Sequence, residues 1–128
     1  MRMIIVDEVM TNCIVMKRMA MKVFGGEIDL ETSPLAAVQA MRERTYDIIV
    51  TAYKMPEMDG SCLVALVRSI DENRRTPVIM TSSCLEPAVR ARLAGHGVDA
   101  FVAKPINAEQ FRQKIFHYLS IRPSVFAA

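Results

Sequence analysis

The stretch IIVTAYKMPEMDG, residues 48–60, decides how this sequence folds. It begins with the apolar run Ile48–Val50 and ends in a turn that contains Pro56 and Gly60. Such a pattern is typical of a buried strand followed by a loop. In α/β proteins, loops at the carboxyl ends of strands carry functional side chains. Yet the residue expected at the tip of this strand is Ala52, whose methyl group has no chemistry.

Other apolar segments around this strand favour an α/β fold. Three of them are near-continuous apolar runs, as expected of parallel strands covered on both faces: Met3–Val6, Val78–Met80 and Ala100–Ala103. Glu27–Glu31 instead alternates polar and apolar residues, which predicts an edge strand with one face in water.

Helical patterns alternate with these strands. The first spans about Met10–Phe24 and is followed by two glycines, which commonly end a helix. Ser33 and Pro34 predict the start of the second, as N-cap and first helical residue. A fifth helix is expected to begin at Asn107, with Gln110 completing a capping-box pattern.

The apolar spacing predicts which helical residues face the core. For the second to fifth helices these are Leu35, Val38 and Met41; Leu63, Leu66, Val67 and Ile70; Val89 and Leu93; and Phe111, Ile115, Tyr118 and Leu119. The fourth helix should begin near Glu86-Pro87 and end at Gly95-His96-Gly97. The alternation of strands and helices predicts a parallel sheet with helices on both faces and right-handed crossovers.

Length and composition narrow the function classes. At 128 residues we expect one domain, 1–121, followed by a tail or linker, 122–128. A net charge of +2 is too small to imply nucleic acid or an anionic membrane as a direct partner. No apolar run approaches the ~18 residues that span a bilayer, and three cysteines without CxxC spacing fit a reduced, cytoplasmic setting.

Polar residues follow several of the predicted strands. Asp7 and Glu8 follow the first, Ser82 follows the fourth, and Lys104-Pro105 ends the fifth. Because the carboxyl ends of parallel strands meet at one edge, we expect these side chains to converge near the switch in strand order. Each residue alone is weak evidence, since an acidic pair after a strand is commonly a solvated helix N-terminus. Their joint order is the informative feature.

That order resembles the receiver domain of bacterial response regulators, in the superfamily of the chemotaxis regulators, over essentially the whole chain. The resemblance implies a flavodoxin-like (βα)5 fold with strand order 2-1-3-4-5. It implies an Asp phosphoacceptor at the position of Ala52, which is the one serious departure. Residues 54–60 match the loop after the acceptor, and the matching site residues are Asp7, Glu8, Ser82, Lys104 and Pro105.

The resemblance also implies roles for these residues. Glu8 would bind Mg²⁺ directly, Asp7 mostly through water, and the backbone carbonyl of Lys54 would complete the protein ligands. Oxygen ligands suit Mg²⁺, and a hard cation neutralises phosphoryl oxygens during transfer. Lys104 would pair with the acceptor and then with the phosphoryl group, to which Ser82 would donate a hydrogen bond.

Two further features follow from the resemblance. Phe101 matches the switch aromatic, which enters the space that Ser82 vacates on moving toward the phosphate. The Lys104–Pro105 peptide bond is expected to be cis.

The expected partners are a histidine kinase or a histidine phosphotransfer protein. They would dock on the first helix, where Met10, Cys13 and Met16 form either an apolar docking face or part of the core. The fourth helix, fifth strand and fifth helix form a possible surface for a homodimer or an output partner.

Ala52 removes the nucleophile and one anionic metal ligand, so Mg²⁺ binding should be weak. We therefore expect a receiver module of a two-component phosphorelay, not an enzyme, that cannot take phosphate at the usual site. Ala52 is then an engineered or recently lost Asp, which the retained site residues favour, or the mark of a natural pseudo-receiver that acts by binding alone. An Asp-nucleophile phosphohydrolase is disfavoured because Val9 stands where that class wants a second Asp. A flavin site is disfavoured because Asp7 and Glu8 would repel its phosphate.

Overall fold

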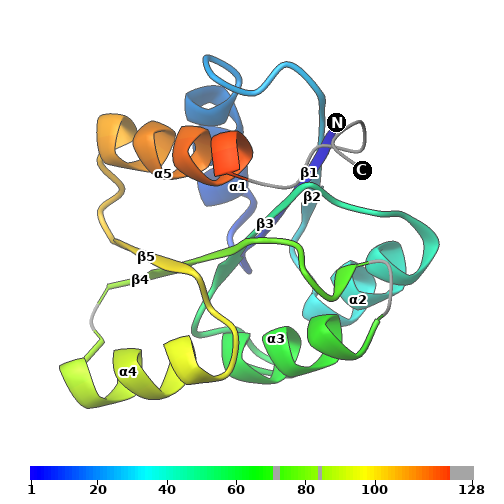
Figure 1. Cartoon of the computed structure of the whole chain (residues 1–128), viewed down its shortest axis with the longest axis vertical. Helices are drawn as coiled ribbons and strands as arrows, with labels where there is room; N and C mark the ends of the chain where they lie inside the picture. The colour runs from blue at the N-terminus through cyan, green and yellow to red at the C-terminus, as the bar shows by residue number, and fades with distance from the viewer. Residues whose placement is uncertain (71–72, 84, 122–128) are drawn as a thin grey trace.

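A parallel sheet lies between two layers of helices (Figure 1). The structure is a computed structural model that describes residues 1–70, 73–83 and 85–121. Its strands are β1 Arg2–Val6, β2 Glu27–Glu31, β3 Ile48–Ala52, β4 Val78–Ser82 and β5 Ala100–Ala103. Their order, β2-β1-β3-β4-β5, with every pairing parallel, confirms the predicted doubly wound fold.

The helices divide between the two faces of the sheet. They are α1 Met10–Ala20, α2 Pro34–Glu43, α3 Gly60–Ser69, α4 Pro87–Gly95 and α5 Ala108–Ile121. Helices α1 and α5 lie together on one face, and α2, α3 and α4 cover the other (Figure 1).

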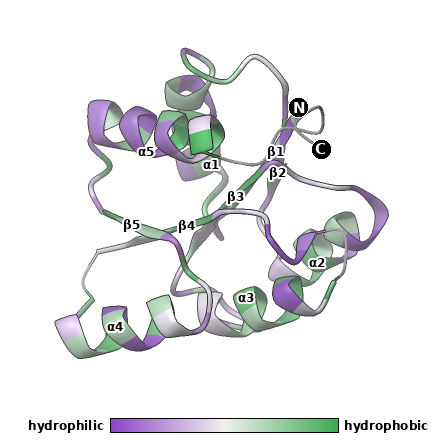
Figure 2. Cartoon of the chain, viewed as in Figure 1, coloured by the Kyte–Doolittle hydropathy of each residue, from purple (hydrophilic) through white to green (hydrophobic). Residues whose placement is uncertain are grey.

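Each face of the sheet has its own apolar core. Along β3, Ile48 and Val50 contribute to the core beneath α1 and α5, whereas Ile49 contributes to the opposite core. Successive strand side chains point to opposite faces, so a strand buried on both must be apolar throughout. Figure 2 shows this pattern, with hydrophobic residues along the central strands and hydrophilic residues on outer helix surfaces.

Two predictions about helices are wrong in detail. Helix α1 ends at Ala20 and not at Phe24; the backbone N–H of Phe24 bonds to the Ala20 carbonyl and the aromatic side chain is buried. Leu35 is 55% exposed and does not face the core. The helix begins at Pro34, which sets the buried stripe at Pro34, Ala37, Val38 and Met41.

The predicted helix starts are confirmed. The Ser33 hydroxyl accepts a hydrogen bond from the Ala36 N–H at 3.3 Å, and the Asn107 side chain accepts one from the Gln110 N–H at 2.9 Å. Helix α5 ends at Ile121, and the predicted tail 122–128 lies outside the described residues, as does Cys84. In the described part of the chain, none of the helices combines the length and apolarity that a membrane span requires.

Candidate functional site

The carboxyl edge of the sheet brings the predicted site residues together from four strands. In the parallel register, Val6 pairs with Thr51, Ala52 with Thr81, and Ser82 with Ala103. Asp7, Ala52, Ser82 and Lys104 therefore stand at the ends of β1, β3, β4 and β5, in a row across one edge.

Asp7 and Lys104 form an ion pair across this edge. The Lys104 Nζ atom lies 2.9 Å from Asp7 Oδ2, and the Asp7 side chain is 1% exposed while that of Lys104 is 29% exposed. The other carboxylate oxygen, Oδ1, accepts hydrogen bonds from the Val9 N–H at 2.9 Å and from Asn12 Nδ2 at 3.3 Å. Both oxygens of this buried carboxylate thus have donors, as a buried charge requires.

This arrangement differs from what the resemblance implied. The resemblance gives Lys104 an acidic acceptor at position 52 as its partner; Ala52 carries no charge, and Lys104 pairs here with Asp7. Asn12 was missed by sequence reasoning. Its only signal is a polar side chain in the first turn of α1, five positions after Asp7.

Ala52 is held closely by the loop that follows it. Its side chain is buried, and the N–H of Gly60 donates a hydrogen bond to the Tyr53 carbonyl at 2.6 Å. A Cβ atom at Gly60 would lie 2.6 Å from the Ala52 carbonyl oxygen and 2.7 Å from Cε of Met80. Glycine at position 60 is therefore what lets α3 begin directly against the end of β3.

Thr81, which pairs with Ala52 in the parallel register of β3 and β4, has a buried hydroxyl that is unpaired within the described part of the chain. The Thr81 hydroxyl is buried and has no hydrogen-bond partner among the described residues. Paired residues of parallel strands point to the same face of a sheet, so a longer polar side chain at position 52 would extend beside this hydroxyl. A buried polar group without a partner is rare in proteins and calls for a physical reason.

Asp59 has a structural task in the same loop. It is the N-cap of α3, and its Oδ1 atom accepts from the Cys62 N–H at 3.0 Å and from the Ser61 hydroxyl at 2.5 Å. Burial would raise the pKa of Asp59, but the hydrogen bonds from Ser61 and Cys62 outweigh it and hold the pKa below its ordinary value. This carboxylate is thus committed to capping.

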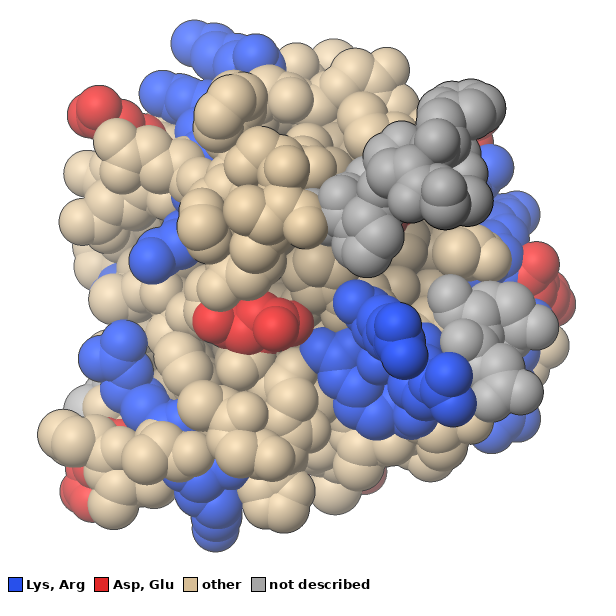
Figure 3. Space-filling model, in the orientation of Figure 1, with Lys and Arg blue, Asp and Glu red and all other residues tan. Residues whose placement is uncertain are grey.

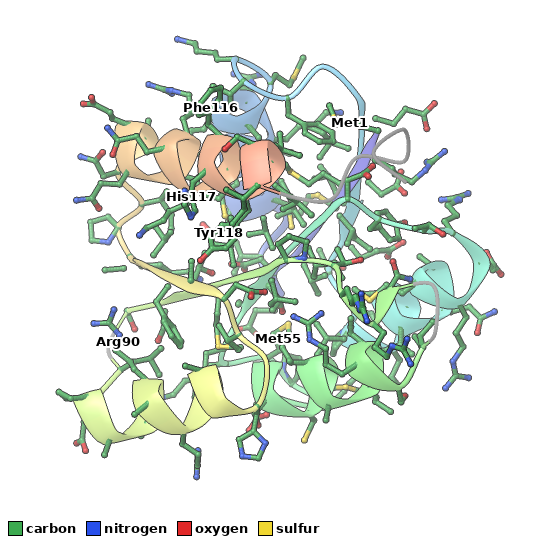
Figure 4. All side chains as sticks on the ribbon, viewed as in Figure 1. Met1, Met55, Arg90, Phe116, His117 and Tyr118 are labelled. Atoms are coloured by element: carbon green, nitrogen blue, oxygen red, sulfur yellow. The ribbon has the colours of Figure 1, made fainter. Side chains whose placement is uncertain are left out.

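A small cavity of about 130 Å³ lies where β4 and β5 end, and both Ser82 and Phe101 line it. Arg90 reaches it from α4, with its guanidinium carbon 5.2 Å from the centre of the Phe101 ring, within cation–π range. Figure 4 shows Arg90 extending from α4 toward β5. The Lys104–Pro105 peptide bond that follows β5 is cis.

The residues present do not fit a Mg²⁺ site well. Glu8 is exposed and Asp7 is fully engaged, and no cluster of three potential His, Cys, Asp or Glu ligands occurs within residues 1–70, 73–83 and 85–121. A divalent cation ~4 Å from the Lys104 ammonium would be repelled by about 2 to 8 kcal/mol between water and a partly buried site.

The docking face predicted on α1 is wrong for two of its three residues. Cys13 and Met16 are 0% and 1% exposed and belong to the core beneath α1 and α5. Together with Ala20 they occupy the helix stripe that faces the sheet, at spacings of three and four residues. Burial, followed by the charge of Asp7, raises the pKa of the Cys13 thiol to about 11. Only Met10, at 44% exposed, remains accessible.

Met10 is one of four accessible apolar side chains at the N-cap and in the first two turns of α1. Val9, Met10, Ile14 and Val15 are each between 42% and 46% exposed. Beside them a groove of about 500 Å³ runs between α1 and the loop after β5, lined by Asn12, Val15, Met16, Met19, Ser83, Lys104, Pro105 and Ile106.

The sequence and the fold of this chain both match known proteins. The family model of the response regulator receiver domain matches residues 3–116. The chain is 29% identical over 91 residues to the signal transduction histidine-protein kinase BarA of Shigella flexneri, covering 71% of the chain but only 10% of the kinase. It is 33% identical over 82 residues to the two-component response regulator ORR2 of Oryza sativa subsp. indica, covering 64% and 32% of the two chains.

A similar protein of comparable length is the chemotaxis protein CheY-3 of Vibrio cholerae, 24% identical over 90% of this chain and 88% of that one. Among solved structures, a two-component response regulator from Clostridium difficile superposes with a TM-score of 0.87 at 23% identity, covering 96% and 98% of the two chains. The receiver domain of the sensor histidine kinase PA1611 from Pseudomonas aeruginosa, solved with a magnesium ion in its active site cleft, superposes with a TM-score of 0.82 at 20% identity, covering 93% and 97%.

Proposed function

Because the chain belongs to the response regulator receiver domain family, we propose that it is a receiver module of a two-component phosphorelay that takes no phosphoryl group at the usual position. The observation that carries this proposal is Ala52, which ends β3 in the row of site residues and has no nucleophile. Family resemblance gives Ser82 and Lys104 the role of phosphoryl contacts and Phe101 that of the switch aromatic.

Neighbouring oxygen nucleophiles do not replace the missing carboxylate. The Thr51 hydroxyl is buried and donates to the Ala52 carbonyl oxygen at 3.0 Å. The Asp59 carboxylate is the N-cap of α3 and accepts a hydrogen bond from the Cys62 N–H. Phosphoryl transfer depends on positioning a nucleophile in line with the phosphodonor. The proposed function is accordingly signalling by binding and not catalysis.

The buried hydroxyl of Thr81 supports the view that Ala52 replaces an Asp by engineering or recent loss. An Asp at position 52 would extend a carboxylate on the same face of the sheet, beside a hydroxyl that lacks an acceptor. Its loss would leave the donor unsatisfied, as is observed.

A second candidate is a natural pseudo-receiver that binds a partner without phosphorylation. The ion pair between Asp7 and Lys104 supports it, because that pair gives both residues a structural task that needs no acceptor. Retention of these two residues is therefore no argument against a natural Ala52.

The proposed partner is a histidine kinase or a histidine phosphotransfer protein. The kinase BarA and other named relatives belong to this signalling class. The exposed side chains of Met10, Ile14 and Val15 on α1 offer an apolar contact, and α4, β5 and α5 offer a second face for a homodimer or output partner. On the face in Figure 3, the largest group of basic side chains lies near acidic groups. The net charge of the chain is only +2, which favours a protein partner over nucleic acid. We propose a cytoplasmic setting for this partnership.

The experiment restores the acceptor. The chain, Ala52→Asp and the neutral control Ala52→Asn are incubated with Mg²⁺ and a small-molecule phosphodonor and then weighed intact. A phosphoryl adduct on the Asp variant alone supports a disabled receiver. An adduct on none of the three favours the binding-only module. An adduct on the Ala52 chain contradicts the proposal.

A further inference from the structure

We propose that the Lys104 ammonium takes the place of a divalent cation at Asp7, so that this site is balanced in charge without metal. The inference deepens the proposed function, because it concerns the same edge of the sheet. Its test reads cation binding through stability, and not phosphoryl uptake, so either claim can fail while the other stands.

Both carboxylate oxygens of Asp7 already accept hydrogen bonds. Oδ2 accepts from Lys104 Nζ at 2.9 Å, and Oδ1 accepts from the Val9 N–H and from Asn12 Nδ2. With a side chain 1% exposed, this carboxylate has no face open to water through which a hydrated cation would arrive. Mg²⁺ gives up its water shell reluctantly and is commonly held partly through water, so such a ligand is a poor one.

Lys104 is fixed at the carboxyl edge of the sheet through its backbone. Its backbone N–H donates to the Ser82 carbonyl at 2.9 Å, which ties the residue to the end of β4. The side chain, 29% exposed, crosses from the end of β5 to the end of β1. A cation entering between these strands would have to displace the ammonium from Asp7 or bear its repulsion.

Few other acidic side chains accompany Asp7 at this edge. Glu8 is exposed, and across residues 1–70, 73–83 and 85–121 no group of three His, Cys, Asp or Glu side chains that could hold a metal ion occurs. Removing the ammonium would change this balance, because Asp7 would then be a buried charge without its counterion. A buried charge that loses its partner strongly destabilises a protein. We expect an added cation at Asp7 to relieve that penalty.

The test is thermal unfolding of the whole chain, Lys104→Met and the control Lys114→Met, in EDTA and in 10 mM MgCl₂ or MnCl₂. Lys114 is an exposed lysine of α5, so its loss should leave the midpoint nearly unchanged. We expect Lys104→Met to melt roughly 5–10 °C below the parent chain in EDTA. Mg²⁺ should return ~3–6 °C of this to the variant and leave the parent midpoint unchanged.

A double variant separates charge from packing. Asp7→Asn combined with Lys104→Met removes both charges, so its midpoint should lie above that of Lys104→Met and no longer respond to Mg²⁺. Were the parent chain to gain as much from Mg²⁺ as Lys104→Met does, the ammonium would not be standing in for a cation. An equal response of the double variant would also overturn the inference, since the metal would then bind somewhere other than Asp7.

Discussion

Returning an Asp to position 52 should destabilise the metal-free protein. The substitution places a carboxylate at a buried position of β3, beside Asp7 at the end of the neighbouring strand β1. Neighbouring strands lie about 5 Å apart. At ~5 Å, the carboxylates at positions 52 and 7 would repel each other by about 3 kcal/mol at an effective dielectric constant of 20. Attraction to Lys104 and a hydrogen bond from Thr81 offset part of this. We therefore expect a net loss of about 1–2 kcal/mol in the free energy of unfolding.

The same substitution should create a response to Mg²⁺. The new carboxylate at position 52 adds a third acidic group to Asp7 and Glu8. It also competes for Lys104, which frees Asp7 to face a cation. A site with a Kd near 1 mM would return about 1.4 kcal/mol at 10 mM Mg²⁺.

The assay is urea or thermal unfolding of Ala52→Asp in EDTA and in MgCl₂. Ala52→Asn is the matched control, because it has nearly the same shape and no charge. Equal stability of the two variants in EDTA, together with no rise of Ala52→Asp in Mg²⁺, would refute this reasoning.

The surroundings of Cys13, Tyr46 and Gly60 each have a consequence that can be measured in solution. Cys13 should resist alkylation at pH 8 while Cys62 reacts, because Cys13 is buried with a pKa raised to about 11 and Cys62 is exposed; peptide mapping by mass spectrometry reads both. Burial, together with the hydrogen bond that the Tyr46 hydroxyl donates to the Asp29 carboxylate, raises the pKa of Tyr46 from 10.0 to about 12. Its contribution to stability is therefore present below pH 10 and lost as pH rises from 10 to 12. In urea unfolding, the midpoint of the parent chain should fall between pH 10 and 12, and the midpoint of Tyr46→Phe should fall less over that range. Gly60→Ala should lower the free energy of unfolding by about 1–3 kcal/mol, because its Cβ would crowd the end of β3. Gly25→Ala, with nothing within 4 Å, should change it little, and a denaturant series on both variants compares them.

The fold could be predicted from the sequence because the apolar pattern has one consistent solution. The continuous apolar run Ile48–Val50 predicts a central strand buried on both faces, and the alternating pattern of Glu27–Glu31 predicts an edge strand. The sheet order confirms both predictions. Boundaries were less predictable, since they depend on tertiary contacts. Phe24 continues the apolar pattern of α1, yet it reaches the core from a turn after the helix has ended. Leu35 matches helical spacing but lies one position outside the stripe that the N-cap defines.

The sequence predicts where the site lies but not which of its side chains contact one another. Asp7 and Lys104 were expected near one another because parallel strands end at a common edge. That Lys104 pairs with Asp7 depends on which charges are within reach, and a pattern of residue types does not contain that distance. The same holds for Cys13 and Met16. An apolar helix residue can face either the core or a partner, and only the packing of α1 shows that these two face the core.

The intact mass of the unaltered chain after exposure to a phosphodonor with Mg²⁺ tests whether Ala52 prevents phosphoryl uptake. Ala52→Asp is treated in parallel as the variant that carries a carboxylate acceptor. We expect the Ala52 chain to keep its original mass, while the Asp variant gains one phosphoryl group that is lost under alkaline conditions, as an acyl phosphate is. A stable phosphoryl adduct on the Ala52 chain, mapped to any residue at the carboxyl edge of the sheet, would contradict it.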